Sequence, residues 1–304
     1  MPHSHAHASK RRRPPNLRRT WLFVAGADAG AQAAALAASP DVIIPDLEDF
    51  TPPPLRPRGR EMILGLLDKA HKLGIVAGVR VNPLASEGRN DLAVVMQAKP
   101  DVVLLPKASA PEQIVELDRA ITDHERRLVI PTGTTEIVPT VETAAGLVGT
   151  HAIARAVKRV TACLLGAEDM AADLGVERTP EGVELAYVRS RFLVECVAVG
   201  VVAIDVPYTF SDEVGARSDT QHGRRLGYQA KSVVSPAHVS VVNEVLTPGH
   251  EAVERAQRLV TAFETARAAG RDRVEHAGTL VEMPTYLTAK RLIARAEALA
   301  RWVH

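Results

Sequence analysis

The chain has 304 residues, of which 46% are hydrophobic and 24% charged, and its formal net charge is +1. This composition is ordinary for a globular protein and excludes wholesale disorder, while the near-zero charge gives no general electrostatic reason to expect a nucleic-acid partner. No apolar run approaches the ~18 residues needed to span a bilayer, so no membrane partner is expected.

The first segment, residues 1–18, is basic and contains several prolines. The cations that precede the first acid, Asp28, are Lys10, Arg11, Arg12, Arg13, Arg18 and Arg19. A disordered tail is the simplest interpretation, and contact with nucleic acid or membrane, or a targeting role, are the alternatives. The segment has no hydrophobic stretch of signal-peptide length, so secretion is not expected.

Short apolar segments rich in β-branched residues recur along the rest of the chain. Eight of them are predicted to be strands: 20–26, 41–46, 75–82, 101–107, 128–142, 160–166, 201–207 and 230–235. Helical spacing between them predicts helices that include 29–38, 57–73, 111–125, 144–158 and 182–199. The hydrophobicity of the strands is continuous rather than alternating, which indicates burial on both faces and parallel pairing.

Eight strand–helix units in roughly 240 residues favour a (β/α)8 barrel over an open sheet. No phosphate-binding glycine fingerprint follows the first strand. We therefore predict an α/β fold, with a TIM-barrel catalytic domain over 19–246 and a C-terminal helical extension over 247–304. The extension should contain a helix over 251–269 and a final helix beginning near Pro284, and it could clamp the barrel or contact a neighbouring subunit.

The two cysteines, Cys163 and Cys196, lie in apolar runs without metal-ligand spacing. This pattern indicates buried thiols in a reducing compartment. A cytoplasmic location is therefore expected.

Polar side chains gather at the predicted carboxyl ends of five strands, whose loops converge on one mouth in a barrel. They are Asp46, Glu48, Asp49, Arg80, Asn82, Lys107, Glu142, Glu168 and Asp169. Oxygen ligands without His or Cys favour Mg²⁺, with Mn²⁺ as an alternative, over zinc. The sequence therefore predicts a metal-dependent enzyme.

Each of these residues also has a structural interpretation. Glu142 and Asp169 could instead stabilise the amino-terminal turns of the helices that follow them, where the helix dipole favours negative charge. Arg80 is costly to bury without an anion, so either a functional role or an internal salt bridge is expected. At least one acid of the cluster at 46–49 should pair with Arg80 or contact metal-bound water. Lys107 could equally belong to an ordinary ion pair.

Several short motifs in order carry a family resemblance. They are Trp21–Gly26, Asp46–Asp49, Arg80–Pro83, Leu105–Lys107, Val141–Thr143 and Gly166–Gly175. They resemble the citrate lyase β-subunit-like branch of the HpcH/HpaI aldolase superfamily, over about Arg19 to Leu292. The resemblance implies a Mg²⁺-dependent TIM barrel that cleaves a 3-hydroxyacyl-CoA, such as malyl-, citramalyl- or citryl-CoA. It also implies a keto acid and an acyl-CoA as partners and a homotrimer or homohexamer.

The resemblance further implies roles for single residues. Glu142 and Asp169 correspond to the metal ligands, and Arg80 to the arginine that binds the substrate carbonyl and stabilises the enolate. Glu282 corresponds to an acidic catalytic residue that acts on the thioester side, where the family usually has Asp.

The other acids and lysines of the mouth complete the set of candidates. Glu48 and Asp49 are candidate catalytic residues, and Asp46 and Lys107 are candidate substrate-binding residues.

One more substrate-binding candidate, Lys231, belongs to a segment that resembles a turn associated with coenzyme A. Ser235 replaces the histidine of that turn. Together with Glu282, this departure leaves two alternatives open. One is a CoA-independent, metal-dependent aldolase for hydroxy-keto acids, and the other is a catalytically idle barrel that binds a metabolite.

Overall fold

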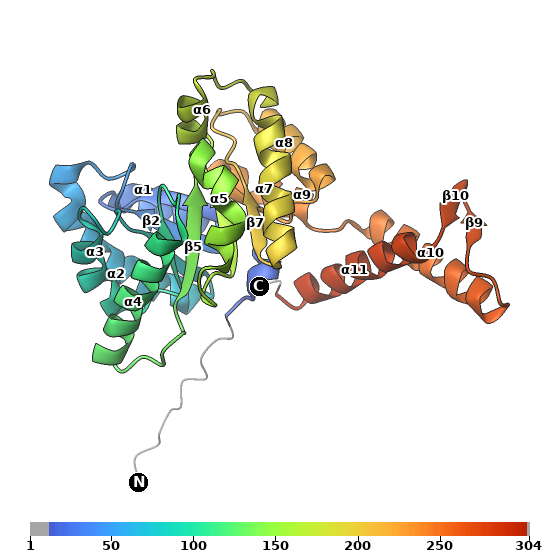
Figure 1. Ribbon diagram of the computed structural model, residues 1–304, viewed down its shortest axis with the longest axis horizontal. Coiled ribbons are helices and arrows are strands. Elements are labelled where there is room, and N and C mark those ends of the chain that lie inside the picture. Colours follow the sequence, from blue (N-terminus) through green and yellow to red (C-terminus); the bar gives the residue numbers. More distant parts are fainter. Residues whose placement is uncertain (1–11, 303–304) are drawn as a thin grey trace, which may run out of the picture. The chain divides into compact units, whose positions relative to one another are not determined.

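A computed structural model describes residues 12–302 of the chain (Figure 1). The chain divides into two compact units, one extending to Asn243 and the other beginning at Glu244. Within residues 12–302, no helix combines the length and the apolarity that a membrane span requires.

In the first unit, eight parallel strands close into a barrel in the order β1 to β8, as the sequence predicts. The strands are β1 (Thr20–Ala25), β2 (Val42–Asp46), β3 (Val76–Arg80), β4 (Val102–Leu105), β5 (Glu136–Val141), β6 (Ala162–Leu165), β7 (Val202–Asp205) and β8 (Ala230–Val233). The helices of this unit are α1 (Ala29–Ala37), α2 (Arg56–Leu73), α3 (Gly88–Val95), α4 (Pro111–Arg127), α5 (Ala144–Arg155), α6 (Glu168–Leu174), α7 (Ala186–Val199) and α8 (Glu213–Leu226). A further helix, α9 (Val239–Leu246), runs across the boundary between the two units. The predicted (β/α)8 fold is confirmed.

The fifth strand is shorter than predicted. The prediction covered 128–142, whereas β5 begins at Glu136. Val129 and Gly133 adopt left-handed backbone angles, with φ of 54° and 92°. Such angles turn the chain and prevent the extended pairing that a strand requires.

Alternate side chains of the strands fill the barrel interior. Trp21 and Phe23 of β1, Val42 and Ile44 of β2, and Val138 of β5 belong to one buried cluster inside the strands. Because side chains alternate along a strand, residues two positions apart point into the same interior. The packed cluster supports the carboxyl ends of the strands, near which the charged residues predicted for the site lie.

The prediction of a disordered tail is wrong for residues 12–18. Pro15–Leu17 form a short 3-10 turn. The Arg18 guanidinium makes two hydrogen bonds to the carboxylate of Glu136, at 2.7 and 2.8 Å, and Arg13 lies 2.6 Å from Asp41. Both arginines are buried, so acids at the amino ends of β2 and β5 order this segment by charge-assisted hydrogen bonds. The remainder of the predicted tail, residues 1–11, lies outside the described residues.

The second unit contains α10 (His250–Ala268), α11 (Met283–Ala300) and an antiparallel pair of strands, β9 (Val274–His276) and β10 (Thr279–Val281). The rings of Phe263 and Tyr286 stack with their centroids 4.9 Å apart, which joins the two helices. The two helices predicted for the carboxyl-terminal extension are therefore present.

Candidate active site

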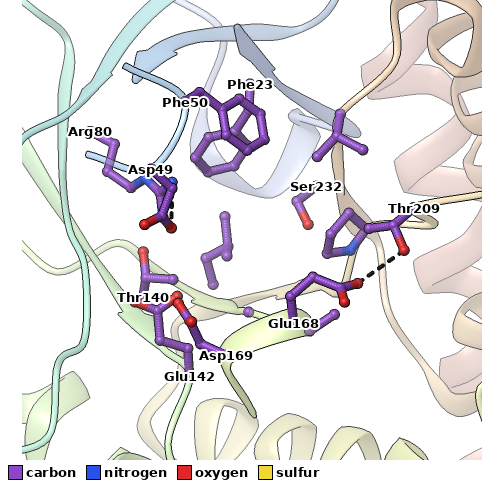
Figure 2. Close-up of a pocket in the computed structure, with 15 residues that line it drawn as sticks. Phe23, Asp49, Phe50, Arg80, Thr140, Glu142, Glu168, Asp169, Thr209 and Ser232 are labelled. Carbon is purple, nitrogen blue, oxygen red and sulfur yellow. Dashed lines mark hydrogen bonds and ion pairs between the residues drawn. The ribbon is translucent and has the colours of Figure 1, made fainter. Parts of the chain in front are cut away.

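The carboxyl ends of the strands surround a cavity of about 390 Å³ in the barrel unit. The ionisable side chains that line it include Asp49, Arg80, Glu142 and Asp169 (Figure 2). The rings of Phe23 and Phe50 form an apolar wall beside Arg80, whose guanidinium carbon lies 5.2 and 6.0 Å from their centroids. The barrel thus gathers side chains from the carboxyl ends of several strands around one cavity.

Arg80 ends β3 and is held by Asp46, its register partner at the end of β2. The Arg80 Nε and Nη2 atoms donate to the two oxygens of Asp46 at 2.8 and 2.6 Å. Asp46 is fully buried and also accepts hydrogen bonds from the backbone N–H groups of Glu48 and Phe50. The prediction that Asp46 binds substrate is therefore corrected, because its oxygens are already engaged in positioning Arg80.

Two further acids surround Arg80. Glu48 is buried, and its carboxylate lies 2.9 Å from Arg80 Nη1 and 2.7 Å from Lys107 Nζ. Asp49 lies 3.2 Å from Arg80 Nη2, and its side chain is 48% exposed. Burial alone would lower the pKa of Arg80, but hydrogen bonds to Asp46 and the charges of Asp46, Glu48 and Glu142 raise it. Arg80 is therefore a permanent positive charge at the cavity.

Glu142 follows β5 directly and is held from two sides. One oxygen accepts a 2.6 Å hydrogen bond from the backbone N–H of Lys107, whose left-handed φ of 52° is an uncommon conformation for a lysine. Gly166 approaches the other oxygen so closely that a Cβ there would lie 2.7 Å from it. Glycine is therefore required at 166 to leave room for the carboxylate of Glu142.

Burial raises the pKa of Glu142 to about 7, although the charge of Arg80 and the hydrogen bond from Lys107 oppose the shift. The charges of Asp169 and Glu48 raise the pKa further. The surroundings therefore leave this buried carboxylate short of positive charge, as expected for a residue that serves a cation.

Asp169 lies in the first turn of α6, with a side chain 41% exposed and 3.9 Å from Lys107 Nζ. Figure 2 shows the side chains of Glu142 and Asp169 at the same edge of the cavity. One buried and one accessible carboxylate are a donor set that suits a hard divalent cation. Among residues 12–302, no cluster of three or more His, Cys, Asp or Glu residues could hold a metal. A cation beside this pair would therefore take its remaining ligands from water or a bound molecule.

The structure does not bring Lys231 to the cavity. Its buried Nζ donates to the Val206 carbonyl at 2.6 Å and contacts Asp219 and Asp205 at 2.5 and 3.2 Å. Arg189 pairs with the same two acids. The predicted substrate-binding role of Lys231 is corrected, because the amino group belongs to a buried ion-pair network.

Glu282 immediately precedes α11 in the second unit, and its side chain is exposed. Its catalytic role stays a prediction.

Sequence reasoning missed several residues of the cavity. Phe23, Phe50, Thr140 and Ser232 all line it. Thr140 precedes Glu142 by two positions, so strand alternation could have placed it on the same face. Phe23 looked like an ordinary core residue, and nothing in the local pattern separates it from one.

The raised pKa of Glu142 predicts a pH-dependent stability for the metal-free protein. Its carboxyl group ionises near pH 7 when folded, against an ordinary pKa of 4.5. Between the unfolded pKa of 4.5 and the folded pKa of about 7, the folded state binds a proton that the unfolded state has released. The free energy of unfolding therefore falls as the pH rises through this range. Glu142→Gln should match the wild type near pH 5 and exceed it by on the order of 2 kcal/mol at pH 8. Urea unfolding in the presence of a chelator measures both values, and an equal difference at the two pH values would contradict the assignment.

A parallel barrel that carries paired carboxylates and a buried arginine at the carboxyl ends of its strands has the arrangement of a (β/α)8-barrel enzyme. A family model described as HpcH/HpaI aldolase/citrate lyase matches residues 19–236. The chain therefore belongs to the HpcH/HpaI aldolase/citrate lyase family and is an enzyme of the lyase class. The resemblance inferred from the sequence motifs is confirmed.

Known relatives cover nearly the whole chain. The citrate lyase subunit beta of Haemophilus influenzae is 32% identical over 284 residues, which are 93% of this chain and 98% of the relative. A (3S)-malyl-CoA thioesterase of Cereibacter sphaeroides is 31% identical over 284 residues, covering 93% of this chain and 95% of the relative.

Solved structures share the fold. The citrate lyase beta subunit of Mycobacterium tuberculosis, complexed with oxaloacetate and magnesium, is 28% identical with a TM-score of 0.63 and covers 77% of this chain and 100% of that chain. The protein CitE of the same organism, in complex with magnesium, acetoacetate and coenzyme A, is 25% identical with a TM-score of 0.74. That match covers 92% of this chain and 98% of the other.

Proposed function

We propose that the protein is a Mg²⁺-dependent carbon–carbon lyase, or condensing enzyme, for a 3-hydroxyacyl-CoA of the malyl-, citramalyl- or citryl-CoA kind. The observation that carries the proposal is the gathering of Glu142, Asp169 and Arg80 around one cavity. The names of the relatives and the magnesium, keto acid and coenzyme A of the solved structures support it.

Glu142 and Asp169 would hold the Mg²⁺ ion, with Mn²⁺ as an alternative. When bound, the ion supplies Lewis acidity and a template for the oxygens of a keto acid. Glu142 suits this role because it is fixed by the backbone of Lys107 and lacks compensating charge. Asp169 suits it because its carboxylate faces the cavity.

Arg80 would bind the substrate carbonyl and stabilise the enolate oxygen that develops on carbon–carbon cleavage. Asp46 holds the guanidinium rigidly, so the positive charge needs no reorganisation during the reaction. The wall of Phe23 and Phe50 excludes water from one side of the charge, which strengthens its effect.

The remaining charged residues near the cavity would have different roles. Asp49 lines the cavity and is the acid of the 46–49 loop best placed to exchange a proton with the substrate. Glu48, bound between Arg80 and Lys107, would orient these two cations. Lys107, half-exposed beside Asp169, would contact a substrate carboxylate. Glu282 would act on the thioester side, supplied within a homotrimer or homohexamer.

A second candidate, a CoA-independent aldolase for hydroxy-keto acids, is favoured by one observation. Lys231 resembles the lysine of a coenzyme A turn. Its amino group already donates hydrogen bonds to Asp205, Asp219 and the Val206 carbonyl. A cytoplasmic location is proposed with either function, and it is supported by the buried free thiols of Cys163 and Cys196.

A substrate panel tests the function. The Mg²⁺-loaded protein is mixed with malyl-, citramalyl- and citryl-CoA, and separately with free hydroxy-keto acids, and all products are quantified. We expect an acyl-CoA and a keto acid in equal amounts from at least one thioester, and none after chelation. Free CoA with an intact hydroxy acid would indicate a thioesterase instead, and cleavage of free acids alone would indicate the CoA-independent aldolase.

A further inference from the structure

The side chain of Thr140 has an unusual position at the cavity. Thr140 lies on β5 two residues before Glu142, lines the cavity and is 1% exposed. Its hydroxyl oxygen is buried, and no hydrogen-bond partner for it occurs within residues 12–302. Two other buried polar atoms without a hydrogen bond, Arg13 Nη1 and Glu48 Oε2, each belong to an ion pair. No ion pair can satisfy a hydroxyl group.

Buried threonines elsewhere in the barrel unit show what Thr140 lacks. Thr51 donates to the Asp46 carbonyl at 2.5 Å, Thr150 donates to the Gly146 carbonyl at 3.0 Å, and Thr220 donates to the Ala216 carbonyl at 2.6 Å. Two of these bonds are made to the preceding turn of a helix, an option that a strand does not offer. Because an unsatisfied buried hydroxyl costs free energy, a group of this kind at a cavity indicates a partner that arrives with a ligand.

The neighbours of Thr140 define the chemistry of that ligand. Strand alternation puts Thr140 on the same face of β5 as Glu142. Figure 2 shows its side chain at the polar edge of the cavity that also carries Arg80, Glu142 and Asp169. The Glu142 charge contributes to the raised pKa of Arg80, so the two groups that flank Thr140 are within electrostatic reach of each other. A ligand held there by a cationic Arg80 would present oxygen acceptors, and the hydroxyl of Thr140 can donate to one of them.

We propose that Thr140 is a ligand-binding residue whose hydroxyl donates a hydrogen bond to an oxygen of a bound 2-oxo acid. The inference takes the class of ligand, a 2-oxo acid, from the proposed function. It adds Thr140 as a residue that discriminates between this ligand and others. The bond forms only when the ligand is present, so it contributes to affinity and to discrimination rather than to folding. An analogue without the acceptor oxygen would leave the hydroxyl unpaired and bind less tightly.

Calorimetric titration of pyruvate into the Mg²⁺-loaded protein tests the proposal, with Thr140→Val as the variant and Thr140→Ser as its matched control. Valine keeps the branched shape and removes the hydroxyl, so the Kd for pyruvate should rise about tenfold. Serine keeps the hydroxyl, and its Kd should stay within about threefold of the wild-type value. Thermal unfolding of the metal-free and ligand-free proteins should give an equal or higher Tm for the valine variant.

Two outcomes would overturn the proposal. If the Kd for pyruvate is unchanged in Thr140→Val, the hydroxyl makes no hydrogen bond to the ligand. If the ligand-free variant also has a lower Tm, the hydroxyl has a structural partner within the protein instead. Failure of the Mg²⁺-loaded wild type to bind pyruvate, or glyoxylate titrated in the same way, would exclude a 2-oxo acid as the ligand. Binding by the wild type without turnover of any thioester would overturn the proposed function and leave the role of Thr140 intact.

Discussion

Replacement of Asp169 by asparagine or of Glu142 by alanine is expected to lower Mg²⁺-dependent turnover by on the order of a thousandfold. Each change removes one of the two carboxylates that would hold the cation. The two sites should differ in their effect on folding, because Glu142 is buried with a raised pKa and Asp169 is 41% exposed. Steady-state kinetics and calorimetric titration with Mg²⁺ measure both losses.

Asp173→Asn is the matched control for Asp169→Asn. Asp173 lies on the same helix, α6, and its carboxylate accepts a hydrogen bond from the backbone N–H of Ala144. The control should keep wild-type turnover and Mg²⁺ affinity within about twofold, because its carboxylate caps α5 and does not line the cavity. Full activity in Asp169→Asn would remove that residue from the proposed metal site.

Arg80→Lys is expected to lower turnover by about 10²–10³-fold while keeping the charge. Lysine cannot reproduce the two parallel hydrogen bonds that Arg80 makes with Asp46, so its ammonium group would lose the fixed direction of the guanidinium. Arg80→Ala should in addition lower the free energy of unfolding by about 3–5 kcal/mol, because Asp46 would stay buried without its cation and Glu48 would keep only Lys107.

Arg89 supplies the matched pair of control substitutions. Its side chain is 61% exposed and pairs with Glu116 at the surface. Arg89→Lys and Arg89→Ala should leave turnover unchanged and shift the free energy of unfolding by less than about 1 kcal/mol. Denaturant unfolding and steady-state kinetics on the four variants separate the two effects, and a stable, fully active Arg80→Lys protein would contradict the assigned role.

The local pattern of the sequence predicted most of the architecture. Continuous apolar runs marked most of the strands, because a strand buried on both faces is largely apolar along its length. The exceptions include β8, which contains Lys231 and Ser232. The acids of the mouth were also predictable, since Glu142 follows its strand directly and Asp169 lies four residues after the end of β6. Both positions depend only on where a strand ends.

Local sequence does not predict which charges meet. Arg18 appeared as one cation of a tail, yet its partner Glu136 stands 118 residues away. Lys231 appeared as a ligand-binding lysine, yet the acids that bind it come from β7 and α8. These partners depend on the closure of the barrel, which brings distant segments together.

The barrel, the family and the set of acids and cations at the carboxyl ends of the strands could all be predicted from the sequence, because they follow from periodicity and short motifs. The burial and the contacts of each member of that set could be seen in the three-dimensional structure alone. Asp46 and Asp49 stand three residues apart in one acidic segment, but Asp46 is fully buried against Arg80 and the side chain of Asp49 is 48% exposed at the cavity. The difference arises because hydrogen bonding and desolvation depend on distance and burial in space, and neither can be derived from spacing along the chain.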